Sequence, residues 1–219
     1  MKLFLFCCLI SFSSFAHVES HELFVTADGP KIPKKRFNII VNAVENQFMP
    51  YAAANGRVLE FFTDYDADWA QGFARRWETD QVHVYGGLAA LPNGTEDVFA
   101  LVLCHELGHL YGGIPYNDEY NKMAVEGQAD YWAGKVCFEQ VLPLLEKREG
   151  SFEERGTEAA LILTAFFADN RSLPRPDLRT PDLSIVSQVL KTHPQPQCRL
   201  DTYVSGLQNL LPPACWMPR

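Results

Sequence analysis

Two histidines and a glutamate in the stretch LCHELGHLY, residues 103–111, have the spacing of a metal site. His105 and His109 are four residues apart, so on a helix their imidazoles lie on one face and can reach a common point. Glu106 would stand beside that point. A nitrogen-rich ligand set favours zinc over hard cations such as calcium. The pattern therefore predicts that His105 and His109 bind zinc and that Glu106 takes a proton from water during hydrolysis.

A third metal ligand must come from elsewhere, because a catalytic zinc site uses three protein ligands and keeps one position for water. The stretch EGQAD, residues 126–130, offers two carboxylates one helical turn apart. We expect Glu126 to bind the metal and Asp130 to accept the remaining N–H of His105. The alternative is a set of ordinary hydrogen-bonded core residues. A buried, unpaired cluster of this kind would cost several kcal/mol in desolvation, which favours the metal.

Apolar spacing indicates the first elements that must position these residues. Apolar residues recur at helical intervals between 37 and 48, and Pro50 is expected to close that helix. Three strands are predicted, over 57–63, 70–77 and 81–85. They would form a small antiparallel or mixed sheet lying between helices.

The remaining elements are predicted to be helical. Asn93 and Glu96 are expected to form a capping box at the start of the helix that carries HELGH, and Gly112 is expected to end it. Later helices are predicted over 122–145, 156–168 and 199–211. A stretch rich in proline and polar residues precedes the last one. The sequence thus predicts an α+β fold in which a small sheet packs against an active-site helix and further helices.

Length and composition favour one globular domain, residues 17–219. The chain has 219 residues, of which 47% are apolar. A formal net charge of −8, and the absence of any Lys/Arg run longer than the three residues 34–36, argue against nucleic acid as a partner. Residues 1–16 combine Lys2, an apolar run and a small-x-small ending at Ala16, which is typical of a secretory signal. We expect a secreted or periplasmic protein without a transmembrane segment in the mature chain.

Four cysteines remain after removal of the expected signal. Cys198 and Cys215 flank one short predicted helix and are favoured as a disulfide. Cys137 lies seven residues beyond Asp130, about 10 Å along a helix. If Asp130 contacts the histidine that follows Cys104, the sulfurs of Cys104 and Cys137 should be too far apart to bond. Cys104 is then expected to be a buried free thiol.

HELGH followed by an ExxAD motif resembles the gluzincin metallopeptidases, in particular the family of the heat-shock protease HtpX, the mitochondrial Oma protease and the CAAX-prenyl endopeptidases. The stretch 192–194, Thr-His-Pro, followed by Arg199, is similar to a signature of that family near its C-terminus. The likeness covers roughly 70–203. It implies a zincin-like minimal gluzincin domain that binds one zinc ion. It also implies that His193 stabilises the oxyanion and that Arg199 supports the site.

The resemblance further implies how a substrate is held. In that family the strand before the active-site helix forms an edge that pairs with an extended substrate, a place that residues 82–85 occupy here. Gln71 stands where family members often have an asparagine that helps to hold the substrate backbone, and its longer amide could serve.

The sequence therefore predicts a zinc-dependent endopeptidase that acts on extended or unfolded polypeptides. A zinc exopeptidase is one alternative, although no motif for an acidic anchor of a free amino terminus is visible. A zinc-stabilised chaperone-like or peptide-binding protein with little turnover is the other.

Overall fold

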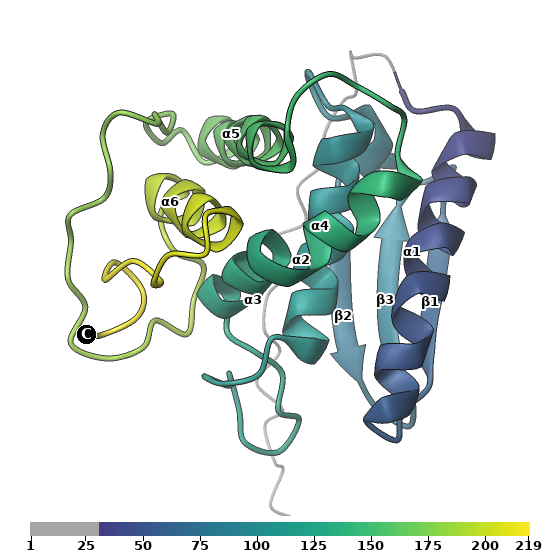
Figure 1. The fold of residues 1–219 in the computed structure, drawn as a ribbon, viewed down its shortest axis with the longest axis horizontal. Coiled ribbons are helices and arrows are strands. Elements are labelled where there is room, and N and C mark those ends of the chain that lie inside the picture. Colours follow the sequence, from purple (N-terminus) through teal and green to yellow (C-terminus); the bar gives the residue numbers. More distant parts are fainter. Residues whose placement is uncertain (1–30) are drawn as a thin grey trace, which may run out of the picture.

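The computed structural model describes residues 31–219, so the expected signal peptide, 1–16, lies outside the described residues. The described part is an α+β structure with a three-stranded sheet and several helices. In Figure 1 the sheet and α1 (Lys34–Ala54) lie on one side of the molecule. Helices α5 (Phe152–Asn170) and α6 (Pro196–Leu207) lie on the other, with α2 (Glu96–Tyr111) and α3 (Glu126–Trp132) between them.

The sheet is mixed, in agreement with the sequence. Strand β1 (Leu59–Asp64) runs parallel to β3 (Asp80–Tyr85), and β2 (Gly72–Arg76) pairs with β3 in the antiparallel sense. The strand order is β1-β3-β2, so β3 is central. The expectation that residues 82–85 form a substrate-binding edge is therefore wrong, because β3 is paired on both sides. Within the described residues, β2 is the edge strand that lies next to α2.

Helix α1 continues through Pro50 and ends at Ala54, so the expected stop at that proline is wrong. Proline removes one backbone hydrogen bond, which favours a helix end but does not require one. Pro50 lies on the exposed face, while Phe48 and Ala52 on either side of it are buried. Burial of these side chains against the core offsets the missing bond.

Helix α2 is the central helix, and nearly all of its residues are buried. Its N-cap is Thr95, whose side chain accepts from the Val98 N–H (3.4 Å), so the expected capping box of Asn93 and Glu96 is wrong. Asn93 has a positive φ of 57°, and the Glu96 carboxylate instead accepts from Arg36 (2.6 Å). As expected, the helix ends where Gly112 becomes its C-cap.

A capping box does occur on α5, at a motif that the sequence prediction overlooked. The Ser151 side chain accepts from the Glu154 N–H (3.2 Å), and the Glu154 carboxylate accepts from the Ser151 N–H (2.8 Å). This helix consequently begins four residues earlier than the predicted start at 156.

The helix predicted over 122–145 is observed as a continuous helical stretch that begins at Glu126. It consists of α3, a π-helix (Ala133–Cys137), α4 (Phe138–Val141) and a final 3₁₀ turn (Leu142–Leu144). The helix starts late because Ala124 forms a bridge with Tyr116 and the backbone of Val125 is extended.

Both cysteine pairs form disulfides. Cys198–Cys215 is confirmed, and it ties the C-terminal segment to α6. The expectation that Cys104 is a free thiol is wrong, because Cys104 bonds to Cys137, with the two Cα atoms 5.5 Å apart.

The error in the Cys104 expectation lies in where the two helices approach each other. The backbones of α2 and α3 meet at Gly108 and Ala129, where a Cβ on the glycine would lie 2.6 Å from the alanine carbonyl oxygen. Ala133 and Cys137 follow Ala129 at intervals of four and so share its helix face. This face packs along α2, and at its far end Cys137 lies next to Cys104 of α2.

Helices α5 and α6 pack against each other, and α5 also packs on α2. The stretch between them, 171–195, contains neither helix nor strand, as its composition suggested. Among the described residues, no helix combines the length and the apolar character that crossing a membrane requires.

Candidate metal centre

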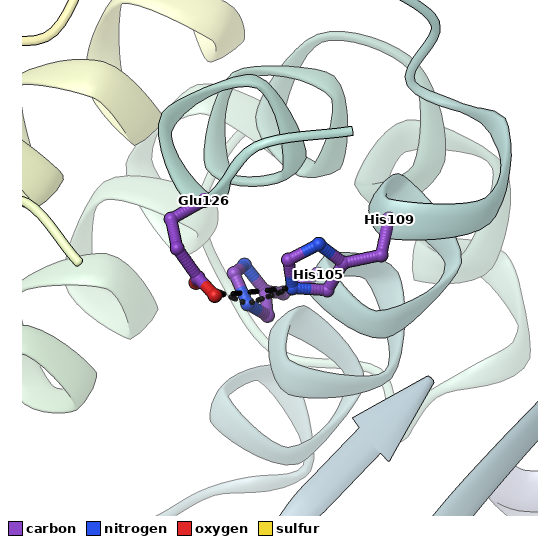
Figure 2. A group of neighbouring side chains, drawn as sticks. All are labelled: His105, His109 and Glu126. Carbon is purple, nitrogen blue, oxygen red and sulfur yellow. Dashed lines mark hydrogen bonds and ion pairs between the residues drawn. The ribbon is translucent and has the colours of Figure 1, made fainter. Parts of the chain in front are cut away.

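Side chains from two helices converge on one point. His105 and His109 project from consecutive turns of α2, and Glu126 is the first residue of α3 (Figure 2). Each offers one ligand atom, and these atoms lie within 4.8 Å of one another. The two Nε2 atoms are 3.1 Å apart, and the Glu126 carboxylate oxygens lie 3.3 Å from His105 Nε2 and 3.6 Å from His109 Nε2.

The partners of the two imidazoles fix which nitrogens face that point. His105 Nδ1 lies 2.7 Å from the Asp130 carboxylate, and His109 Nδ1 lies 2.9 Å from the carbonyl oxygen of Ala124. Both partners are acceptors, so both Nδ1 atoms carry a proton and donate it. In neutral imidazoles the Nε2 atoms then present lone pairs to each other and to Glu126.

The lone pairs of two Nε2 atoms and a carboxylate repel one another at these distances. A positive charge between them is needed to stabilise the arrangement. One additional proton could bridge two of these atoms, but it would leave the third without a partner. Glu126 Oε2 is buried and makes no hydrogen bond of good geometry within residues 31–219, although the Nε2 atoms of His105 and His193 lie 3.3 and 3.2 Å from it. A divalent cation would satisfy all three groups together. The residues present therefore fit a metal ion.

The spacing also suits zinc. Bonds from zinc to imidazole nitrogen are about 2.0–2.1 Å long, so two nitrogens at a tetrahedral angle lie about 3.4 Å apart. The observed separation of 3.1 Å between the Nε2 atoms of His105 and His109 is close to this value. Two nitrogens and one carboxylate oxygen match the ligand set of a catalytic zinc site that keeps a position open.

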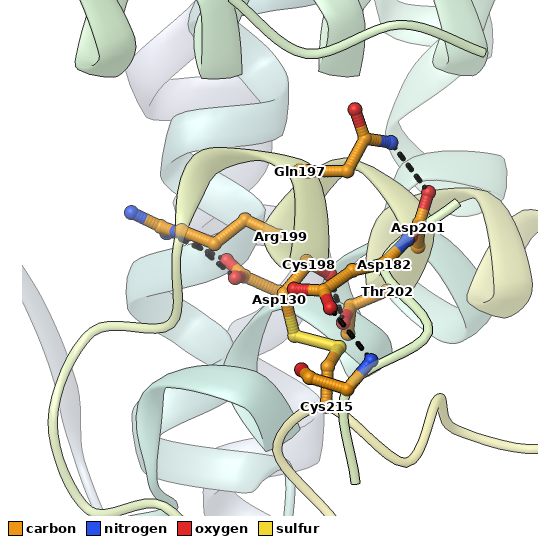
Figure 3. The surroundings of a disulfide bond; sticks show 9 residues. Asp130, Asp182, Gln197, Cys198, Arg199, Asp201, Thr202 and Cys215 are labelled. Carbon is orange, nitrogen blue, oxygen red and sulfur yellow. Dashed lines mark hydrogen bonds and ion pairs between the residues drawn. A yellow bond between two sulfur atoms is a disulfide. The ribbon is translucent and has the colours of Figure 1, made fainter. Parts of the chain in front are cut away.

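A buried ion pair supports His105 from behind. The Arg199 guanidinium donates to both oxygens of the Asp130 carboxylate, with both distances 2.7 Å (Figure 3). Asp130 is fully buried, which by itself raises the pKa of its carboxyl group, but Arg199 and His105 lower that pKa to about 2. The carboxylate thus stays ionised at neutral pH and holds His105 in one orientation.

The same groups set the proton affinity of the metal-free site. Burial alone would lower the pKa of His105, but Asp130 and Glu126 raise it to about 10. Burial alone would raise the pKa of Glu126, whereas His109 and His105 lower it well below its usual range. A metal ion that binds here must therefore displace a proton from His105, and Glu126 is already ionised.

Glu106 is buried beside the three ligand residues and faces the sheet. A Cβ built on Gly72 of β2 would lie 3.5 Å from Glu106 Cγ. Burial raises the pKa of Glu106 above its usual value, although His105 and His109 oppose this effect. A carboxylate with a raised pKa is a stronger base, which suits proton transfer near neutral pH.

The loop before α6 brings a third histidine to the cluster. His193 Nε2 lies 3.2 Å from the Glu126 carboxylate, and about half of the His193 side chain is exposed. Burial lowers the pKa of His193 to about 4 although Glu126 acts in the opposite direction, so the imidazole is neutral at pH 7. Lys191 fixes this loop, because its ammonium donates to the Asn117 carbonyl oxygen (2.8 Å).

These groups line a cleft of about 650 Å³. One wall is β2 together with Gln71, which precedes it. The opposite wall belongs to the C-terminal half of α5 and includes Phe166 and Phe167. Its volume is within the range of ligand-binding sites, and the candidate metal ligands His105, His109 and Glu126 are part of its lining.

Two glycines let the elements approach closely enough to form the site. Gly108, inside HELGH, allows the contact between α2 and α3. At Gly127 a Cβ would collide with the ring of Trp216, which is fully buried. Cys215 precedes Trp216, so the disulfide to Cys198 holds the C-terminal segment against the start of α3.

Every site residue singled out from the sequence lies in this one cluster, around the candidate metal ligands His105, His109 and Glu126. Sequence reasoning missed the Ala124 carbonyl, because a backbone group has no signature in the sequence. It also missed Trp216, which lies far along the chain from the metal motifs. The only sequence signal for Trp216 is its position next to Cys215.

No family model matches this chain, and no curated protein or solved structure gives a significant match. The geometry of the site and the resemblance of its motifs are therefore the two indications of function.

Proposed function

We propose that the chain is a zinc-dependent endopeptidase with a zincin-like fold, similar to the gluzincin metallopeptidases. The observation that carries the proposal is the convergence of His105, His109 and Glu126 in one cleft, with Glu106 beside them. When bound, zinc would polarise a peptide carbonyl and lower the pKa of water towards about 7. This combination of ligands, base and open cleft suits amide hydrolysis without a covalent intermediate.

Glu106 would act as the general base. Its carboxylate accepts a proton from the attacking water and later gives it to the leaving amine. His193 would donate an N–H to the negative charge that develops on the carbonyl oxygen, because its imidazole is neutral at pH 7. Stabilisation of this kind contributes roughly 3–4 kcal/mol in other hydrolases. Arg199 acts indirectly, through Asp130, by fixing the orientation of His105.

The edge of β2 would hold the substrate. The Gln71 carbonyl accepts from the Tyr85 N–H (3.2 Å), so in the antiparallel ladder the peptide groups of Gly72 and Ala74 face the opposite edge. Both residues line the cleft. An extended peptide could pair with these groups and be held without strong side-chain preference, which suits extended or unfolded polypeptides. The two disulfides fit a secreted or periplasmic location.

The test compares the wild type with Glu106→Gln and with a matched surface change, Glu119→Gln, on unfolded casein. Metal content is measured in all three proteins. We expect about one zinc ion per chain in each, and at least roughly 100-fold slower cleavage by Glu106→Gln alone.

Two other results would contradict the proposal in different ways. Equal activity of the wild type and Glu106→Gln would reject Glu106 as the base. Zinc binding without cleavage by any of the three proteins would favour the alternative of a peptide-binding protein with little turnover.

A further inference from the structure

A positively charged side chain lines the cleft without taking part in the metal centre. Arg171 follows the last residue of α5, and its backbone N–H bonds to the Ala168 carbonyl oxygen (3.2 Å). It lines the same cleft as Phe167 and His193. Arg171 as a whole is an exposed residue.

The guanidinium of Arg171 has no hydrogen-bond or ion-pair partner among residues 31–219. Arg199, the other arginine of the cleft, is buried and donates from Nε and Nη2 to Asp130. The carboxylate nearest to Arg171 in sequence is Asp169, and Arg175 already binds both of its oxygens (2.7 and 2.8 Å). Arg171 is thus left with five N–H donors free to bind a ligand in the cleft.

The charge of Arg171 acts on the site. It helps to lower the pKa of His193, and its own pKa is lowered by burial and by the charge of Arg199. The guanidinium nevertheless stays protonated at any physiological pH. The Glu126 carboxylate partly offsets these effects by raising the pKa of Arg171, but no described carboxylate forms an ion pair with Arg171.

The surroundings of Arg171 suit a carboxylate at the end of a short apolar stem. Leu163 and Phe166 form apolar surface on the same wall, against which methylene groups can pack. A guanidinium binds a carboxylate through two parallel hydrogen bonds, which gives both orientation and selectivity.

We propose that Arg171 is a specificity-determining residue that binds a carboxylate of the peptide substrate. The enzyme would then favour cleavage close to a glutamate or aspartate side chain, or close to a free carboxyl terminus. This inference rests on the proposed endopeptidase function and adds a substrate class to it.

The test uses the zinc-loaded chain and pairs of peptides that differ by a single Glu or Gln near the scissile bond. Both ends of these peptides are blocked. We expect kcat/KM to be about five- to tenfold higher for the Glu peptide at one position, since the ion pair forms at a solvent-accessible wall. A Gln peptide with a free carboxyl terminus tests the terminal carboxylate as the source.

Three variants locate the effect. Arg171→Gln should bring the ratio between the Glu and Gln peptides close to one. Arg179→Gln, which removes the same charge from an exposed residue outside the cleft, should leave the ratio unchanged. Lys191→Gln should retain most of the preference for the Glu peptide, because the Lys191 ammonium is bound to the Asn117 carbonyl oxygen. The proposal is overturned by a wild-type ratio near one for both carboxylate sources, or by a ratio that survives Arg171→Gln.

A peptide-binding measurement distinguishes failure of the Arg171 proposal from failure of the proposed endopeptidase activity. Fluorescence anisotropy of labelled peptides on zinc-loaded Glu106→Gln measures the preference for Glu over Gln without any turnover. If the wild type cleaves nothing, the proposed function fails. A binding preference that disappears in the double variant Glu106→Gln/Arg171→Gln still supports the role of Arg171, and the lack of any binding preference rejects it.

Discussion

Arg199 and Asp130 form a buried ion pair with two hydrogen bonds, and Asp130 in turn contacts His105 Nδ1 at 2.7 Å. Three helices meet in this chain of contacts, because Arg199 lies on α6, Asp130 on α3 and His105 on α2. The ion pair therefore links the packing of the helices to the orientation of one candidate metal ligand.

Arg199→Met should destabilise the protein strongly, because it leaves the Asp130 carboxylate buried without a counter-charge. We expect the free energy of unfolding to fall by about 3–5 kcal/mol. Urea unfolding of the metal-free protein measures the change. Arg175→Met is the matched control, because it breaks an exposed pair with Asp169 and should leave the unfolding midpoint nearly unchanged. Equal midpoints for the two variants would contradict the structural role of Arg199.

Asp130 should also make stability depend on pH in the acid range. Its folded-state pKa of about 2 lies below the usual value of 3.8, so its stabilising contribution is complete above about pH 4. That contribution, about 2 kcal/mol, is lost as the pH falls through the folded pKa near 2. Urea unfolding at pH 2–5 should show a steeper pH dependence for wild type than for Asp130→Asn. Parallel curves would exclude this role.

Zinc affinity should rise with pH. In the metal-free protein His105 has a pKa of about 10, so at neutral pH zinc must displace its proton. Loss of one proton per ion makes the apparent affinity increase about tenfold per pH unit below that pKa. Zinc titrations at pH 7, 8 and 9 under competition with a chelator measure the slope. An affinity that is constant over this range would show that His105 is not a ligand.

The sequence predicted the site better than its surroundings. HELGH and EGQAD identified the residues that the structure gathers, because a helical interval of four places side chains on one face whatever the tertiary context. Apolar spacing likewise located the helices that carry them. Both signals are local in the chain.

The features that the sequence did not predict depend on packing between segments that are distant in the chain. Pairing on both sides of β3 follows from the position of β1, which the spacing within one strand does not encode. The bond between Cys104 and Cys137 depends on a close helix crossing at Gly108, and this crossing could not be placed from the two motifs alone. Arg171 carries no motif, and only the fold shows that it lines the cleft.

The Cys104–Cys137 disulfide encloses all three candidate metal ligands in one loop, with a sequence separation of 33. Cys104→Ala/Cys137→Ala should lower the free energy of unfolding by about 3–4 kcal/mol, mainly because the unfolded chain gains conformational entropy. Zinc affinity of the folded protein should change little, because the ligands keep their positions. Urea unfolding and a zinc titration measure the two quantities. Unchanged stability, or unreduced peptide maps without this link, would contradict the assignment.

Gly108→Ala should separate α2 from α3, because the added Cβ would lie 2.6 Å from a backbone oxygen of Ala129. We expect a destabilisation of about 1–3 kcal/mol together with weaker zinc binding. Gly156→Ala is the comparison, since its Cβ meets the movable end of the Leu207 side chain instead of backbone. The same loss of zinc affinity in both variants would show that the helix crossing does not position Glu126.

The most direct measurement is a zinc titration of the full chain in which metal content is followed for wild type, Glu126→Gln and the exposed control Glu119→Gln. If α2 and α3 bring His105, His109 and Glu126 to one ion, wild type and the control bind one zinc per chain. Glu126→Gln then binds at least about 100-fold more weakly. Unchanged zinc affinity in Glu126→Gln, or no zinc bound by wild type, would contradict the shared metal site.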